Sequence, residues 1–224
     1  MSRIIETNGG RDSTGTRPML LETRLERDLL SVSVDAFSDA SRRPSAAAVD
    51  ASRTLALTVD RLLRESNFRA LAVLSSYPGD GRSLTSELLA RGLSEIRPPV
   101  RLLDADPFAA KAGGDVITLD LAENPASGPP FAELTVGRAL FANQRDFLNV
   151  TRALLHRATI GGATVVIDVP ACKSSGIAFA IAEMAGAAIY VARPRGEMSP
   201  AHAEVSAQLE LLGVELLGVV FNDR

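Results

Sequence analysis

A glycine-rich stretch from Ser76 to Ser83, SYPGDGRS, has the layout of a loop that binds phosphate. Gly79 and Gly81 would let backbone N–H groups approach phosphate oxygens, and a helix starting after them would add the positive end of its dipole. Arg82 stands where such loops carry the lysine that reaches the terminal phosphates, and Ser83 stands where their hydroxyl binds Mg²⁺. Because Ser76 replaces the first glycine, the loop alone is as consistent with a plain turn as with a phosphate site.

Carboxylates follow two other apolar runs. VRLLDAD ends in Asp104 and Asp106, and VVIDVP contains Asp168. A carboxylate leaving an apolar strand is costly unless it meets water, a cation or a donor. Asp104 and Asp106 suit Mg²⁺, its waters or a nucleophile, although a helix cap or a solvated turn is the plainer interpretation. An apolar run closing on one aspartate, as at Asp168, is the Walker B arrangement of a nucleotide site.

The elements that position these residues alternate along the chain. Apolar runs predict strands at residues 69–76, 100–106, 115–121, 163–170, 187–193 and 214–223. Helical patterns cover residues 46–65, 84–96, 133–158 (with an interruption at Gly137), 176–185 and 199–213, the last with Ser199 as N-cap. Apolar strands alternating with helices indicate an α/β three-layer domain, a mainly parallel sheet flanked by helices on both faces.

Ligands of such sheets bind at the carboxyl ends of the strands. The glycine-rich loop, the Asp104–Asp106 pair and Asp168 all fall at predicted strand ends, and so does Asn222, whose amide suits a base edge. Each signal is modest, but their joint order along the sheet favours nucleotide binding.

Composition excludes several other classes. The chain has 224 residues, 46% of them hydrophobic, so it can bury one substantial core. A net charge of −3 and the absence of Trp argue against a nucleic-acid partner. The single cysteine, Cys172, excludes an intrachain disulfide and is interpreted as a buried hydrophobe. No window reaches the ~18 apolar residues of a membrane span, so a cytoplasmic location is expected, with any membrane contact made through a partner.

Two regions are expected. Residues 1–45, rich in Ser, Arg, Asp and Gly, are predicted to be a flexible extension, and residues 46–224 to be the nucleotide-binding domain. Within the extension, Leu21, Leu25 and Leu29 are spaced at i, i+4 and i+8, which predicts a short docking helix that forms transiently.

These motifs resemble those of a known family, the cytoplasmic ATPase domain of bacterial tyrosine kinases of exopolysaccharide assembly. That family belongs to the deviant-Walker class, which includes the MinD and ParA ATPases. Its loop, S-x-x-P-G-x-G-K-S, matches SSYPGDGRS except at the lysine, its D-x-D matches LLDAD, and its Walker B D-x-P matches VVIDVP. LGVVFND resembles its closing strand. The resemblance spans about residues 48 to 224 and implies a P-loop NTPase fold.

The resemblance also implies ATP and Mg²⁺ as cofactors, and it assigns residues to three roles. The residues implied for catalysis are Asp104, Asp106 and Arg82. Those implied for nucleotide binding are Gly79, Asp80, Gly81, Arg82, Ser83, Leu84 and Asn222. Those implied for the metal are Ser83, Asp104 and Asp168.

Partners follow from the same resemblance. The family acts with a membrane polysaccharide co-polymerase, which would recruit this chain to the inner face of the membrane. It often carries an E-x-x-R motif in a helix used for ring assembly, and here Asp50 takes the place of the glutamate while Arg53 is retained. Self-association through this helix is therefore expected.

Several residues depart from the family pattern. Arg82 keeps the charge of the lysine and can grip phosphate bidentately, but it is bulkier and its fork is directional. Pro107 and Phe108 follow Asp106, where the family usually has an arginine. The only tyrosines are Tyr77 and Tyr190, in the loop and in a predicted strand, so we do not expect autophosphorylation of a tyrosine-rich tail in this chain.

Three interpretations stay open at this point. The first is an ATP-binding protein of the tyrosine-kinase type, with reduced or no activity, that regulates exopolysaccharide polymerisation or export. The second is a pseudo-kinase that serves as an interaction module. The third is a MinD- or ParA-like positioning ATPase. Two features argue against it: Ser75, Ser76 and Tyr77 occupy the stretch where that group has an extra lysine, and a C-terminal amphipathic membrane helix is lacking.

Overall fold

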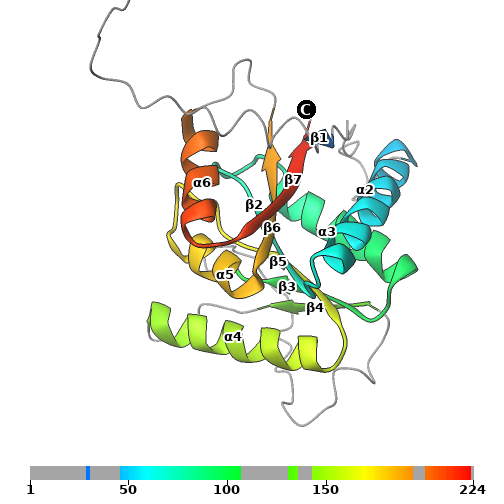
Figure 1. Ribbon diagram of the computed structural model, residues 1–224, viewed down its shortest axis with the longest axis horizontal. Helices are drawn as coiled ribbons and strands as arrows, with labels where there is room; N and C mark the ends of the chain where they lie inside the picture. Colours follow the sequence, from blue (N-terminus) through cyan, green and yellow to red (C-terminus); the bar gives the residue numbers. More distant parts are fainter. Residues whose placement is uncertain (1–28, 31–45, 107–130, 136–142, 194–199, 223–224) are drawn as a thin grey trace, which may run out of the picture.

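The computed structural model describes residues 29–30, 46–106, 131–135, 143–193 and 200–222. Its centre is a seven-stranded parallel sheet with the order β1-β7-β6-β2-β5-β3-β4 (Figure 1). The strands are β1 Leu29–Leu30, β2 Ala70–Leu74, β3 Val100–Asp104, β4 Phe131–Thr135, β5 Thr164–Asp168, β6 Ala187–Ala192 and β7 Glu215–Phe221. The helices are α2 Ala46–Glu65, α3 Arg82–Ile96, α4 Gln144–Ile160, α5 Ile177–Ala185 and α6 Pro200–Leu211.

Helices cover both faces of the sheet, so each face buries its own core. α2 and α3 pack on one face, while α4, α5 and α6 pack on the other (Figure 1). In β2, Ala70, Ala72 and Leu74 face the second set of helices, whereas Leu71 and Val73 face the first. Since successive strand residues point to opposite faces, a strand buried on both sides must be apolar throughout, as the sequence pattern predicts.

The order of the central strands brings the predicted site residues together. β5 lies between β2 and β3. Asp168, the last residue of β5, is in register with Val73 of β2 on one side and with Asp104 of β3 on the other. The loop that follows β2 and the carboxylates that end β3 and β5 therefore meet at one edge of the sheet.

Most predicted elements within the described residues are confirmed, with ends that agree or differ by a few residues, but the helix predicted over 133–158 is wrong at its start. Residues Phe131–Thr135 form the strand β4, which pairs with β3 in parallel. The helix α4 begins only at Gln144, where the Asn143 side chain accepts a hydrogen bond from the Asp146 N–H at 3.0 Å. The backbone of residues 131–135 bonds to a neighbouring strand instead of to itself, because the exposed edge of β3 offers those partners. The strand predicted at 115–121 lies outside the described residues.

The N-terminal region holds a second difference. Leu29 and Leu30 form β1, which pairs with Val219 and Val220 of β7, so Leu29 lies in a strand and not in the predicted docking helix. Leu21 and Leu25 lie outside the described residues, and the boundary at residue 45 stays a prediction. Across the described ranges, no helix is both long enough and apolar enough to cross a membrane.

Candidate phosphate-binding site

The loop between β2 and α3 crosses the carboxyl edge of the sheet and turns at two glycines in the left-handed region. Gly79 has φ 82° and Gly81 has φ 94°. A Cβ built on Gly81 would lie 1.9 Å from Nδ2 of Asn222, and that same Nδ2 donates a hydrogen bond to the Asp80 carbonyl at 3.0 Å. A side chain at Gly81 would therefore force Asn222 to move and to give up this bond. Asn222, which the sequence predicts at the nucleotide, serves in this structure to hold the loop.

Two further side chains, those of Asp80 and Tyr190, fix the start of the loop. The buried carboxylate of Asp80 accepts a hydrogen bond from the Tyr77 N–H at 3.0 Å. The Tyr190 hydroxyl accepts one from the Ser76 N–H at 3.1 Å and lies 2.5 Å from Oγ of Ser76. Burial raises the pKa of Tyr190 to about 12, so its hydroxyl is neutral at physiological pH. Sequence reasoning missed Tyr190, although a lone tyrosine in a buried strand signals a hydroxyl that needs a partner.

The first turn of α3 leaves its backbone donors open. Gly81 has no side chain to cap the helix, and the first hydrogen bond of the turn runs from the Thr85 N–H to the Gly81 carbonyl at 2.9 Å. Within the described chain, the N–H groups of Arg82, Ser83 and Leu84 have no acceptor. Open donors at the positive end of a helix dipole, reached through a glycine turn, fit a phosphate group.

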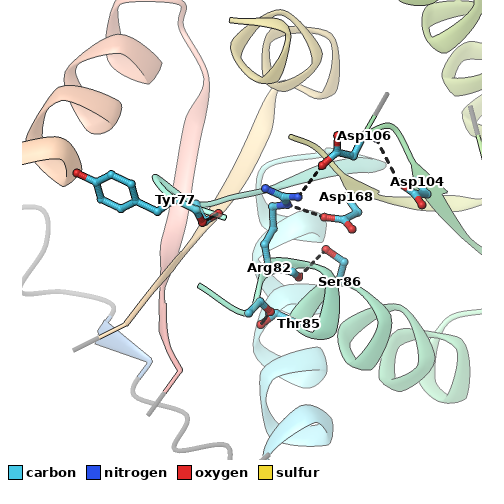
Figure 2. A network of polar contacts seen from close by, with 9 residues as sticks. Tyr77, Arg82, Thr85, Ser86, Asp104, Asp106 and Asp168 are labelled. Carbon is cyan, nitrogen blue, oxygen red and sulfur yellow. Dashed lines mark hydrogen bonds and ion pairs between the residues drawn. The ribbon is translucent and has the colours of Figure 1, made fainter. Parts of the chain in front are cut away.

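The side chain of Arg82 points across the carboxyl edge to two aspartates (Figure 2). Its Nε donates to Oδ1 of Asp168 at 2.8 Å, and an Nη donates to Oδ2 of Asp106 at 3.1 Å. The Asp106 N–H in turn donates to Oδ1 of Asp104 at 3.2 Å. The structure thus brings together all three carboxylates that the sequence predicts, and it places Arg82 among them.

The residues predicted for a metal are arranged differently. Asp104 and Asp168 are paired in register, while the Ser83 side chain is exposed on the first turn of α3. Among the described residues, no group of three or more His, Cys, Asp or Glu side chains is placed to hold a metal ion. Because the Arg82 guanidinium already binds Asp106 and Asp168, this arrangement does not fit a divalent cation between them. The assignment of Ser83, Asp104 and Asp168 to a metal stays a prediction.

Three other polar side chains near the loop are buried, paired elsewhere or directed away from Arg82. Cys172 is buried, and burial raises the pKa of its thiol to about 12 even though the nearby Arg82 charge acts the other way. The interpretation of Cys172 as a buried hydrophobe is confirmed. Lys173 forms an ion pair with Glu204 of α6, which raises its pKa. The Tyr77 side chain points away from Arg82 (Figure 2).

A small hollow lies beside Asn222, between α2, α3 and β7. It is lined mainly by apolar side chains, from the set Ser52, Leu55, Leu84, Thr85, Leu88, Val220 and Asn222. Its cavity volume of about 10 Å³ has room for roughly one water molecule, so it is not a base pocket. The Oδ1 of Asn222 is buried and has no hydrogen-bond partner among the described residues.

Three solved structures share this architecture. The BceF tyrosine kinase domain has a TM-score of 0.66 at 20% identity, covering 92% of this chain and 98% of its own. The kinase domain of the Escherichia coli tyrosine kinase ETK has a TM-score of 0.63 at 22% identity, covering 79% and 76%. The chimerical protein CapA2B2 has a TM-score of 0.63 at 20% identity, covering 90% and 96%. The chain shares the fold of these tyrosine kinase domains.

The predicted α/β fold, a mainly parallel sheet flanked by helices, is therefore confirmed, as is the structural likeness to these kinase domains. No protein-family model matches the sequence, and no curated protein matches it either. At 20 to 22% identity the likeness concerns the fold. The roles of Arg82, Asp106 and Asp168 rest on the contacts of the site itself.

Proposed function

We propose that the chain binds the phosphates of ATP on the loop from Ser76 to Leu84, as a nucleotide-binding protein of the bacterial tyrosine-kinase type. The observation that carries this proposal is the open first turn of α3 behind Gly81, at the carboxyl edge of a parallel sheet. The backbone donors of Arg82, Ser83 and Leu84 supply phosphate contacts that need no particular side chain. Hydrogen bonds between the loop backbone and the side chains of Asn222, Asp80 and Tyr190 fix the conformation of the loop.

ATP, when bound, supplies a phosphoryl group, and the chain's own residues decide whether it is transferred. Asp104, Asp106 and Asp168 are the carboxylates available to orient or deprotonate an attacking group. Two of them are engaged by Arg82. A substrate hydroxyl that approached either carboxylate oxygen bound by Arg82 would have to displace the guanidinium first. This contact favours the second candidate function, a pseudo-kinase that binds nucleotide and transfers little or no phosphate.

Partners belong to the same proposal. A membrane polysaccharide co-polymerase would hold the chain at the inner face of the membrane and couple nucleotide binding to exopolysaccharide polymerisation or export. Self-association would use α2, where Arg53 is exposed and paired with Asp50 and with Glu95 of α3. Exposed charges of this kind can exchange partners with a second copy at little cost.

Calorimetric titration with ATP tests the binding proposal. We expect the wild type to bind and Gly81→Ala to bind at least about tenfold more weakly, because the new Cβ displaces Asn222 and reshapes the loop. Gly213→Ala is the matched control, since Gly213 also has positive φ but nothing within 4 Å of an added Cβ. Its binding should equal that of the wild type.

A phosphotransfer assay on the same samples separates the two candidates. Tyrosine phosphorylation of a co-polymerase segment, or hydrolysis of ATP, would establish a kinase or an ATPase. Binding without turnover would establish the pseudo-kinase. Failure of the wild-type chain to bind ATP in any buffer would refute both.

A further inference from the structure

The guanidinium of Arg82 lies between two carboxylates, buried Asp168 and partly buried Asp106, at the carboxyl ends of two different strands. Asp168 ends β5, and Asp106 lies two residues beyond the end of β3. The side chains of Arg82 and Asp168 are each 10% exposed, and that of Asp106 is 15% exposed. Two negative charges with so little exposure to water are costly, and a nearby cation lowers that cost.

Arginine suits this place better than lysine. A guanidinium presents several N–H groups in a rigid fork, so Nε can serve Asp168 while an Nη serves Asp106. A lysine ammonium is a compact point charge without this fork. It would lie near one carboxylate, lie between the two, or turn away from both to contact a phosphate. The arginine at position 82 therefore contacts both carboxylates at once and offsets one of their two negative charges, and it stands in the place that a divalent cation bridging them would take.

We propose that Arg82 is the resident cation of this site, so that the chain binds polyphosphate without a divalent metal. This inference rests on the proposed binding of ATP to the loop. A divalent cation that bridged Asp106 and Asp168 would have to displace the guanidinium, and the two cations would repel each other at close range. The phosphates are then held by the backbone of the loop and the first turn of α3, with Arg82 as a fixed positive charge beside them.

The first experiment compares ATP binding in Mg²⁺ with ATP binding in EDTA, by calorimetry on the full chain. For the wild type we expect dissociation constants that agree within about threefold. For Arg82→Lys we expect Mg²⁺ to strengthen binding by at least about tenfold, because the compact ammonium leaves the carboxylates open to the metal. Arg91→Lys, an exposed arginine of the same helix that pairs with Glu87, is the matched control and should behave as the wild type.

The second experiment needs no nucleotide. Binding of Mn²⁺, as a stand-in for Mg²⁺, is followed by electron paramagnetic resonance. The wild type should leave Mn²⁺ free, Arg82→Met should bind it, and adding Asp168→Asn to Arg82→Met should abolish that binding.

Wild-type binding of Mn²⁺ equal to that of Arg82→Met would overturn the proposal, and so would a wild-type need for Mg²⁺ as strong as that of Arg82→Lys. If no variant binds ATP in either buffer, the proposed function fails and polyphosphate binding fails with it. The Mn²⁺ titration would then still show whether Arg82 excludes the metal. Should Arg82→Met not fold, the Arg82→Lys comparison decides alone.

Discussion

Two arginines bridge separate elements of the molecule, and their surroundings differ sharply. At the carboxyl edge, Arg82 is 10% exposed and binds Asp106 and Asp168, which are 15% and 10% exposed. On the outer surface of α2 and α3, Arg53 is 55% exposed and pairs with Glu95 and Asp50, which are 57% and 77% exposed. Both arginines contact two carboxylates, so burial is the main variable between them.

Burial decides what each ion pair can do. Removing one partner of a buried pair leaves charges without water or counter-charge, at a cost of several kcal/mol. An exposed pair gains about as much from water as from its partner, so its contribution is small. The Arg82 contacts therefore tie the loop to the ends of β3 and β5, whereas the Arg53 contacts leave their charges available to another molecule.

Arg82→Ala should produce the largest effect on stability. We expect the free energy of unfolding to fall by about 3 kcal/mol, because Asp106 and Asp168 lose their shared cation while staying buried. Urea denaturation at neutral pH measures the change. A loss no greater than that of Arg91→Ala, the exposed arginine of the same helix, would show that burial does not distinguish the two networks.

Gly81→Ala tests whether the loop that presents Arg82 is as tightly specified as its contacts indicate. We expect a loss of about 2 kcal/mol, part from alanine at φ 94° and part from the clash with Asn222. Gly79→Ala carries a similar backbone strain at φ 82° but meets nothing within 4 Å, so about 1 kcal/mol is expected there. Equal losses for the two variants would mean that the Asn222 contact contributes nothing.

Tyr190→Phe removes the hydroxyl that holds Ser76. The expected loss is about 1 kcal/mol, because the buried Ser76 N–H is left without its acceptor. A double-mutant cycle with Ser76→Ala, measured by thermal unfolding, separates the contact with Oγ from the contact with N–H. Additive losses in the cycle would contradict a bond between the two hydroxyls.

Local sequence patterns predict the central strands and most helices of this fold, because strands buried on both faces must be apolar throughout. They fail at β4, an edge strand whose partner, β3, lies about thirty residues earlier in the chain. A signal was present there, since Asn143 followed by Asp146 marks the true start of α4. The prediction extended the helix upstream to residue 133 and so missed this N-cap at Asn143.

The candidate site is also predictable from the sequence only in part. Glycine spacing and strand-end aspartates predict the loop and the carboxylates, since both signals are local. The contacts of Arg82 span 24 and 86 residues of sequence, so they depend on the order of strands in the sheet. The sequence therefore predicts which residues meet at the carboxyl edge, but not that the arginine would bind the carboxylates.

Arg53→Ala should have the smallest effect on the isolated chain and so completes the contrast with Arg82. We expect the free energy of unfolding to change by less than about 0.5 kcal/mol, because Arg53, Asp50 and Glu95 are all solvated. If α2 mediates self-association, the same variant should lower the mass observed by sedimentation velocity, since exposed charges contribute more to partner selection than to folding. Arg91→Ala, an exposed arginine of α3 paired with Glu87, should change neither quantity. A loss of stability near that of Arg82→Ala would mean that the α2–α3 contact needs Arg53 within one chain, and it would remove the reason to assign Arg53 to a partner.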